Sequence, residues 1–178
     1  RTDTLISLLK LNRSNTSHSY FLARFITANN SIYTPDTGTF DQMKSSGTLK
    51  LIESRSIVDS ISNYYQSLQF FNSQSDLQRQ KVDDVHSVNS ELYDGYTFQH
   101  MFANVNSNGN VSSSLNFGIL QPENNPPLLS DDFTAINKVI IAYHYLYATT
   151  QINNEVAMLS SQHGQRLIDV LKKAYHFK

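Results

Sequence analysis

The sequence of 178 residues contains no cysteine, so it offers no disulfide framework, no thiolate nucleophile and no cysteine-ligated metal site. Charged residues are also few, at 16% of the chain, and the formal net charge is only −1. The lysines and arginines are scattered, and Lys172–Lys173 is the only adjacent basic pair. Because proteins that bind nucleic acid usually carry a basic face, the composition argues against a nucleic-acid partner.

The sequence also lacks a long hydrophobic run. No apolar stretch reaches the roughly 18–20 residues needed to cross a bilayer, and no signal peptide is recognisable. The chain opens at Arg1, and Leu5, Leu8 and Leu9 already lie at helical spacing. We therefore expect the sequence to be the soluble part of a longer chain, from which an N-terminal membrane anchor has been removed.

Hydrophobic residues are plentiful, at 39% of the chain, and they recur with a helical period. This pattern predicts a single all-α domain over residues 1–178. Two short amphipathic helices are expected first, at about 4–12 and 17–28.

A third short helix is expected after the turn at 34–38. Thr39 is its predicted N-cap, and Phe40 and Met43 supply its apolar contacts. Gly47 follows at the position that favours a left-handed backbone conformation, which glycine adopts without a steric cost.

Two long amphipathic arms are predicted at 54–101 and 131–177. The apolar spacing of the first arm is clear at its start, in Ile57, Ile61, Tyr64, Leu68 and Phe71. It then passes through Ser75 and Gln78, where a kink, a break and a solvent-facing stretch all remain open. Gly95 is a weak point, because glycine costs about 1 kcal/mol relative to alanine within a helix.

The second arm is expected to be capped by Ser130 and to form either one long helix or two in tandem, since Thr149, Thr150 and Gly164 interrupt its pattern. Packed antiparallel and covered by the short helices, the two arms give an up-and-down helical bundle. A long irregular loop at about 104–130 separates them. It contains an Asn-Gly turn signal at Asn108–Gly109, compatible with a small β-hairpin.

One segment resembles a known family. Residues 39–52 follow the pattern Thr-Tyr-x-x-Leu-Lys-x-Ser-Gly-x-Leu-x-Leu-Ile, with Phe40 in place of Tyr and Met43 in place of Leu, and the following helix carries Tyr64–Tyr65. This is similar to an uncharacterised bacterial family of single-pass membrane-anchored proteins with a helical region after the anchor. The resemblance implies a cell-envelope location, with a periplasmic domain anchored to the inner membrane. The motif itself is explained by a capped short helix that docks on the long one.

Few residues have the spacing of a known catalytic or metal-binding motif. Asp83 and His86 have the carboxylate-x-x-His spacing of di-metal helical bundles, but a second copy is lacking, which favours a solvated helix face. The sequence contains neither a His-Glu-x-x-His zinc motif nor a Gly-x-Ser-x-Gly elbow nor a phosphate-binding loop. We therefore predict no catalytic residue, no metal and no cofactor.

A tyrosine-rich turn of the second arm is the one candidate for a ligand pocket. Tyr143, His144 and Tyr147, with Tyr145 between them, could line such a pocket, since tyrosine combines a flat apolar body with a polar tip. The same residues could equally serve core and interface packing.

Three hypotheses on function follow. The first is a non-enzymatic cell-envelope domain that binds a protein partner, and the second is an extracytoplasmic helical bundle that senses a small ligand. The third is an enzyme of unrecognised type. A cavity with convergent polar groups would favour the second, and an exposed apolar patch would favour the first. The sequence alone leaves the ligand, the partner and the oligomeric state open.

Overall fold

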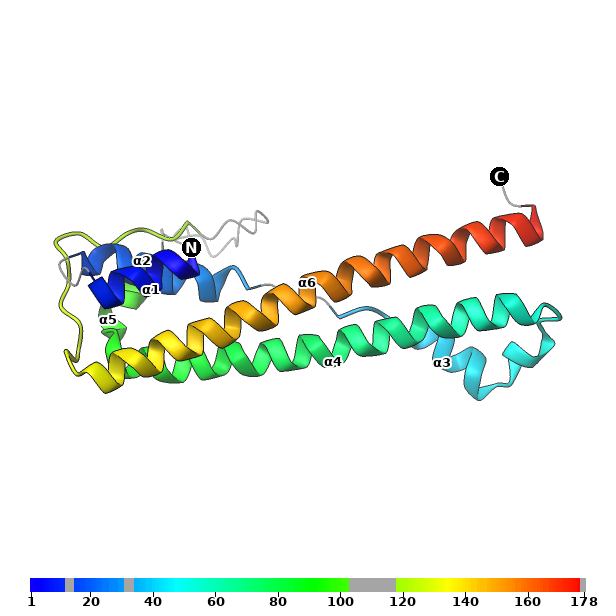
Figure 1. Cartoon of the computed structure of the whole chain (residues 1–178), viewed down its shortest axis with the longest axis horizontal. Coiled ribbons are helices and arrows are strands. Elements are labelled where there is room, and N and C mark those ends of the chain that lie inside the picture. Colours follow the sequence, from blue (N-terminus) through cyan, green and yellow to red (C-terminus); the bar gives the residue numbers. More distant parts are fainter. Residues whose placement is uncertain (12–14, 31–33, 103–117, 177–178) are drawn as a thin grey trace, which may run out of the picture. The chain divides into compact units, whose positions relative to one another are not determined.

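The computed structural model describes residues 1–11, 15–30, 34–102 and 118–176 of the chain. The described part is all-α, as the sequence predicts, and contains no named strand. Its elements in order are α1 (Thr2–Leu11), α2 (Thr16–Ala28), α3 (Gly38–Ser45), the 3-10 helix η1 (Thr48–Leu51), α4 (Arg55–Leu92), α5 (Gly95–His100) and α6 (Phe133–Tyr175). The long helices α4 and α6 pack in the up-and-down arrangement expected of the two arms (Figure 1).

The chain divides into two compact units. The first unit comprises Arg1–Ser31 and Gln80–Ala148, and the second comprises Ile32–Arg79 and Thr149–Lys178. Helices α4 and α6 both run across the boundary, so each unit contains a part of each long helix.

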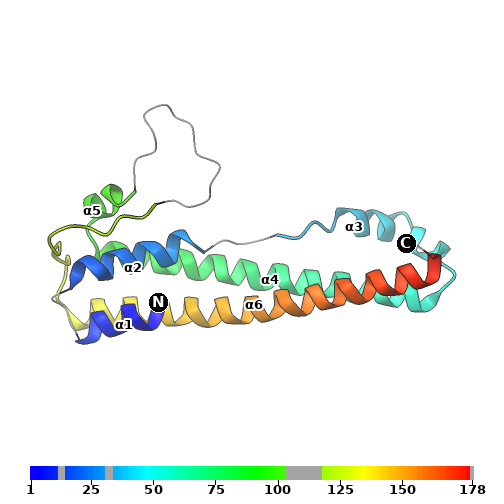
Figure 2. The ribbon, with the colours of Figure 1, turned by 90° about the horizontal axis from the view of Figure 1, so that it is seen from above.

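The first unit is a small four-helix bundle. The short helices α1 and α2 lie beside parts of α4 and α6 (Figure 2) and share one hydrophobic core with them. The fully buried large side chains of this core are Leu5, Leu9, Tyr20, Val85, Leu92, Tyr93, Met101, Val139, Tyr143 and Leu146. The short helices therefore cover the long ones here, as the apolar spacing predicts.

The second unit is a two-helix pair with α3 and η1 packed on it. Phe40 of α3 is buried with Ile57, Ile61 and Leu167, and its ring stacks on Tyr65 of α4 at a centroid distance of 4.1 Å and an interplanar angle of 8°. The short helix thus docks on the long one, which is the structural role expected of the 39–52 motif.

Gly47 has φ = 74°, the left-handed conformation predicted from its place after α3. The prediction that Thr39 caps α3 is wrong, because α3 begins at Gly38 and Thr37 occupies the N-cap position. The Asp36 carboxylate accepts a hydrogen bond from the Gly38 backbone N–H (2.8 Å) and fixes the earlier start.

Helix α4 has an unbroken alternation of four- and three-residue steps along its packed side. The positions are Ile57, Ile61, Tyr64, Leu68, Phe71, Ser75, Gln78, Val82, Val85, Asn89 and Leu92. This is the heptad spacing of a coiled-coil seam. Ser75, Gln78 and Asn89 are buried in it. The polar middle of the arm is therefore a buried polar layer of a continuous helix, and not a kink, a break or a solvent-facing stretch.

The first arm ends earlier than predicted. Helix α4 stops at Leu92 instead of near Met101, and α5 starts at Gly95. The Asp94 carboxylate caps α5 by accepting a hydrogen bond from the Thr97 backbone N–H (2.7 Å), and the Tyr20 hydroxyl accepts one from the Asp94 backbone N–H (2.8 Å). These two bonds satisfy donors that would otherwise belong to a continuing helix.

The second arm is one helix, which passes through Thr149, Thr150 and Gly164 without interruption. Its predicted cap is displaced: Asp132, and not Ser130, accepts a hydrogen bond from the Ala135 backbone N–H (3.0 Å), and the Ser130 hydroxyl accepts one from Asp132. No helix in the described ranges is both long and apolar enough to cross a membrane.

The described part of the irregular loop, residues 118–132, is non-helical and belongs to the first unit. The Tyr20 hydroxyl donates a hydrogen bond to the Pro127 carbonyl (2.9 Å), and the Leu129 backbone N–H donates one to the Leu92 carbonyl (2.9 Å). The Asn-Gly turn signal at Asn108–Gly109 lies outside the described residues.

Candidate functional site

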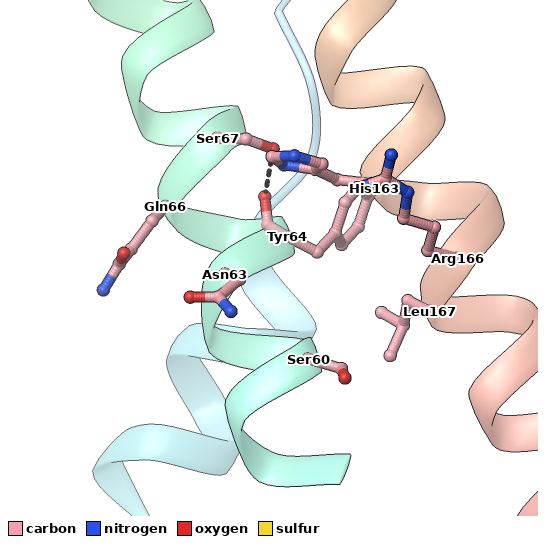
Figure 3. Close-up of a pocket in the computed structure, with 8 residues that line it drawn as sticks. All are labelled: Ser60, Asn63, Tyr64, Gln66, Ser67, His163, Arg166 and Leu167. Atoms are coloured by element: carbon pink, nitrogen blue, oxygen red, sulfur yellow. Dashed lines mark hydrogen bonds between the residues drawn. The ribbon is translucent and has the colours of Figure 1, made fainter. Parts of the chain in front are cut away.

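A cavity of about 440 Å³ lies between α4 and α6 in the second unit (Figure 3). Its lining consists of Ser60, Asn63, Tyr64, Gln66 and Ser67 from α4 and His163, Arg166 and Leu167 from α6. Helical spacing explains the set, since Ser60, Tyr64 and Ser67 recur at four and three residues and therefore share one side of α4. We call this cavity the Arg166 pocket.

The ring of Tyr64 forms the floor between the two helices. It can approach α6 because position 164 is a glycine: a Cβ there would lie 3.0 Å from Tyr64 Cε2. One serine hydrogen bond joins the two helices next to it: the Ser160 hydroxyl donates to the Ser67 carbonyl (3.3 Å), whereas the Ser67 hydroxyl donates within α4 to the Tyr64 carbonyl (2.6 Å).

The opposite side of the helix pair is covered. A smaller cavity of about 190 Å³ lies there, lined by Pro35, Leu68, Phe71 and Ala157 among others, and Tyr64 lines this one too. Pro35 itself is buried. Next to this cavity Tyr65 stacks on Phe40, and burial, followed by the neighbouring Tyr64, raises the pKa of the Tyr65 hydroxyl. The extended segment before α3 and α3 itself thus occupy this side.

The lining of the Arg166 pocket is rich in donors and contains no carboxylate. Arg166 supplies a permanent positive charge with a fork of N–H groups, and Asn63 and Gln66 supply amides. His163 Nδ1 is buried and has no hydrogen-bond partner among the described residues. A buried polar atom without a protein partner is available for a hydrogen bond to water or to a bound ligand. The pocket is therefore suited to an anionic group such as a carboxylate.

The surface that continues from the pocket along α4 and α6 carries exposed apolar side chains. Phe70 and Leu77 follow Asn63 by seven and fourteen residues, and Leu159 and Ile152 precede Arg166 by the same steps. In a heptad-packed helix, residues seven apart lie on the same side. The exposed fractions are 54% for Phe70, 36% for Leu77, 51% for Leu159 and 47% for Ile152.

These side chains lie at matching levels on the two helices. Gln78 and Asn153 are hydrogen-bonded across the seam, and Leu77 and Ile152 directly precede them. We call the whole surface the open face. It consists of Ser60, Asn63, Ser67, Phe70, Gln74 and Leu77 on α4 and Ile152, Glu155, Leu159, Gln162 and Arg166 on α6.

The structure does not bring the predicted pocket residues Tyr143, His144 and Tyr147 into one environment. Tyr143 is fully buried in the first unit; its hydroxyl donates to the Ala23 carbonyl (3.1 Å) and accepts from Asn89 Nδ2 (2.9 Å). His144 and Tyr147 are exposed. Burial raises the pKa of Tyr143 well above its usual value, consistent with a core position.

The other candidate, Asp83 with His86, lies exposed on α4. In the described part of the chain no group of three or more possible metal ligands is brought together.

Sequence reasoning missed Tyr64, His163 and Arg166 as a group, because they come from helices nearly a hundred residues apart. One signal could have indicated them. Gly164 interrupts an otherwise regular helix without ending it, and a glycine inside a helix leaves room for the close approach of another group because it has no Cβ.

Comparison of the chain with protein-family models, with curated proteins and with solved structures gave no match. The fold and the site define a helical-hairpin protein with an open, donor-rich face, and function has to be argued from that face.

Proposed function

We propose that the protein is a non-enzymatic binding domain, whose open face binds a protein surface that carries a carboxylate next to apolar side chains. One observation carries this proposal. The open face combines four large exposed apolar side chains with a carboxylate-free pocket that contains Arg166.

The apolar part of the open face supports a protein partner. Single exposed apolar residues are common, but a group of them on one side of a helix pair marks an interaction surface. Phe70 and Leu159 lie beside the seam where a third helix would pack in a larger bundle. An amphipathic helix of a partner would bury them, in the same way that helical ligands dock in apolar grooves.

The polar side chains around Arg166, at one end of the open face, support the proposal that the partner carries a carboxylate. Arginine is enriched at the centres of interfaces because its guanidinium binds carboxylates with two parallel hydrogen bonds. Asn63 and His163 lie around Arg166 and add donors without adding a competing negative charge.

A peptide experiment tests this function. A labelled amphipathic helical peptide, with leucines at i, i+4 and i+7 and one glutamate a turn away, is titrated with the protein by fluorescence anisotropy. We expect Arg166→Gln to weaken binding by about tenfold or more, since hydrogen bonds to charged groups contribute about 1.5–3 kcal/mol. Replacing the peptide's glutamate by glutamine should have the same effect.

Two neighbouring residues provide matched controls. Lys172 is exposed on the same helix but outside the open face, so Lys172→Gln should leave the affinity unchanged. Met158 is as exposed as Leu159 but lies next to the open face and not on it. Leu159→Ser should therefore weaken binding and Met158→Ser should not. Equal effects within either pair would contradict the proposed function.

A second candidate function is the binding of a small carboxylate. The buried Nδ1 of His163, which has no partner in the described part of the chain, favours it. Thermal unfolding in acetate, benzoate and short dicarboxylates is the test. A ligand at about 100 times its dissociation constant stabilises the folded state by about 2.7 kcal/mol. The stabilisation should disappear in Arg166→Gln, and a shift that this variant retains would exclude the pocket as its cause.

For the location, we propose a cell-envelope protein with an N-terminal membrane anchor and the helical domain in the periplasm. The resemblance of residues 39–52 and Tyr64–Tyr65 to the anchored bacterial family supports this. Fractionation of cells that express the full-length protein, followed by protease treatment of spheroplasts, tests it. Recovery in the cytosolic fraction would contradict the proposal.

A further inference from the structure

We propose that the partner of the open face is a second copy of this chain, and that the carboxylate bound by Arg166 is Glu155 of that copy. This inference rests on the proposed function, because it names the partner of the same surface.

The α6 part of the open face, apart from Ile152, is self-complementary in charge. Glu155, Leu159, Gln162 and Arg166 follow one another at steps of four, three and four residues, a series that reads the same in both directions. When two such stripes lie antiparallel, Glu155 meets Arg166 of the other copy at both ends, and Leu159 meets Gln162 between them. Two identical ion pairs form from one stripe, as a two-fold symmetric interface requires.

The α4 part of the open face is self-complementary in size and has no charge. Ser60, Asn63, Ser67, Phe70, Gln74 and Leu77 follow at steps of three, four, three, four and three residues, again the same in both directions. In an antiparallel pair Leu77 meets Ser60, Phe70 meets Ser67, and Gln74 meets Asn63. Each large apolar side chain thus faces a small hydroxyl, which leaves room for close packing.

Both stripes have their centre at the same level of the helix pair. The centre of the α4 stripe lies between Leu68 and Gln69, and that of the α6 stripe lies between Ser160 and Ser161. The hydrogen bond from the Ser160 hydroxyl to the Ser67 carbonyl shows that these levels coincide within a residue or two. One two-fold axis perpendicular to the helices therefore serves both stripes.

The same two-fold symmetry places residues of the second copy in the Arg166 pocket. Ser60 and Arg166 both line it, and their opposites across the axis are Leu77 and Glu155 of the second copy. These two residues lie at one level, because Leu77 precedes Gln78, whose partner Asn153 lies two residues before Glu155. An apolar side chain and a carboxylate thus enter a pocket that offers Leu167 and Tyr64 beside Arg166 and Asn63.

Charge reversal tests the inference by sedimentation velocity across about 1–100 µM protein. The unaltered chain should show a concentration-dependent dimer. Glu155→Arg and Arg166→Glu should each raise the dimer dissociation constant by about tenfold or more, because like charges then face each other twice. The double variant restores both ion pairs with reversed polarity and should recover most of the affinity.

Two control variants carry the same charge changes away from the open face. Asp59 lies midway between the seam residues Ile57 and Ile61, on the outer side of α4, and Lys172 is exposed near the end of α6. Asp59→Arg and Lys172→Glu should leave the dissociation constant unchanged. Circular dichroism of every variant checks that the helices remain.

Because the chain has no cysteine, single cysteines report the geometry directly. Leu159 and Gln162 face each other across the proposed axis, so a mixture of Leu159→Cys and Gln162→Cys chains should form a disulfide-linked heterodimer under mild oxidation. A mixture of Met158→Cys and Gln162→Cys should not. Cross-linking that is equal in both mixtures would overturn the antiparallel pairing.

The outcomes separate this inference from the proposed function. A chain that stays monomeric, or a dimer indifferent to both charge reversals, overturns the second copy as partner. If the acidic peptide still binds in an Arg166-dependent manner, the proposed function stands without this inference. If neither the dimer nor peptide binding depends on Arg166, both are wrong.

Discussion

Tyr64 of α4 and Gly164 of α6 lie so close that a Cβ on position 164 would come within 3.0 Å of Tyr64 Cε2. The ring also makes an edge contact with Tyr65 at a centroid distance of 5.2 Å, and Tyr65 is stacked on Phe40. The absence of one methyl group on α6 thus determines how the two helices meet at the Arg166 pocket.

We expect Gly164→Ala to lower the free energy of unfolding by about 1 kcal/mol. Overpacking costs about 1–3 kcal/mol, which outweighs the gain of about 1 kcal/mol in helix propensity. In a Tyr64→Ala background the clash is absent, so the same substitution should raise stability by about 1 kcal/mol. A double-mutant cycle by urea denaturation measures the coupling. The same change in both backgrounds would show that Tyr64 is not the obstacle.

Gly47 provides a test of backbone conformation alone. Its φ of 74° suits glycine, and an added Cβ would meet no atom within 4 Å, so only the backbone opposes substitution. Gly47→Ala should lower the unfolding free energy by about 1 kcal/mol, and Gly47→Val by more. Gly47→Asn is the control, since asparagine tolerates the left-handed region. Equal losses for Ala and Asn would contradict this explanation.

Phe40 should control the docking of α3. Phe40→Ala removes a buried ring and its stacking on Tyr65, and should cost about 3 kcal/mol in the unfolding free energy. Hydrogen exchange should accelerate most in Gly38–Ser45. Tyr65→Phe keeps the stacked ring and should leave both measurements close to those of the unaltered chain. Unchanged exchange in α3 after Phe40→Ala would indicate that other contacts hold it.

Tyr143 should make stability depend on alkaline pH. Burial raises the pKa of its hydroxyl above the usual value of 10.0, so the ionised form favours the unfolded state. The stabilisation is complete below the unfolded pKa of about 10 and is lost as the pH rises towards the higher folded pKa. Unfolding free energies measured by urea between about pH 7 and pH 11 should therefore fall at the upper end.

Tyr143→Phe separates this residue from the other tyrosines. At neutral pH it removes the partner of Asn89 Nδ2 and one of the two side-chain donors to the Ala23 carbonyl, the other being Thr27, which should cost about 1–3 kcal/mol. Above about pH 10 its stability should fall less steeply than that of the unaltered chain. A fall remains, because burial also raises the pKa values of Tyr20 and Tyr93. An identical slope in both proteins would exclude Tyr143 as a contributor.

The sequence predicts the all-α class, the two arms and the left-handed Gly47, because each depends on local spacing or on one residue's backbone preference. The buried polar layer could not be predicted in this way. Gln78 and Asn89 indicate solvent when α4 is considered alone. They are buried because Asn153 and Tyr143, on α6, supply their hydrogen bonds.

The helix ends and the candidate site also could not be predicted from local sequence alone. Ser130 is a good cap by residue type, yet Asp132 performs the capping, since two neighbouring residues of similar propensity compete. The aromatic neighbours of Tyr143 predict a pocket residue, although its position on the packed side of α6 places it in the core. The Arg166 pocket arises only when Tyr64 and Gly164 are brought together in three dimensions.

The hydrogen bond between Gln78 and Asn153 has a mechanical consequence. If α6 slid along α4 by one heptad, Asn153 would leave Gln78 and enter the level of the buried apolar side chains of Leu68 and Phe71. Each buried polar group left without a partner costs about 1–3 kcal/mol. The hydrogen-bonded pair therefore fixes the register of α4 and α6 along their axes. Because it opposes sliding of one helix past the other, any relative movement of the two helices in this unit has to be a tilt or a rotation about the helix axes.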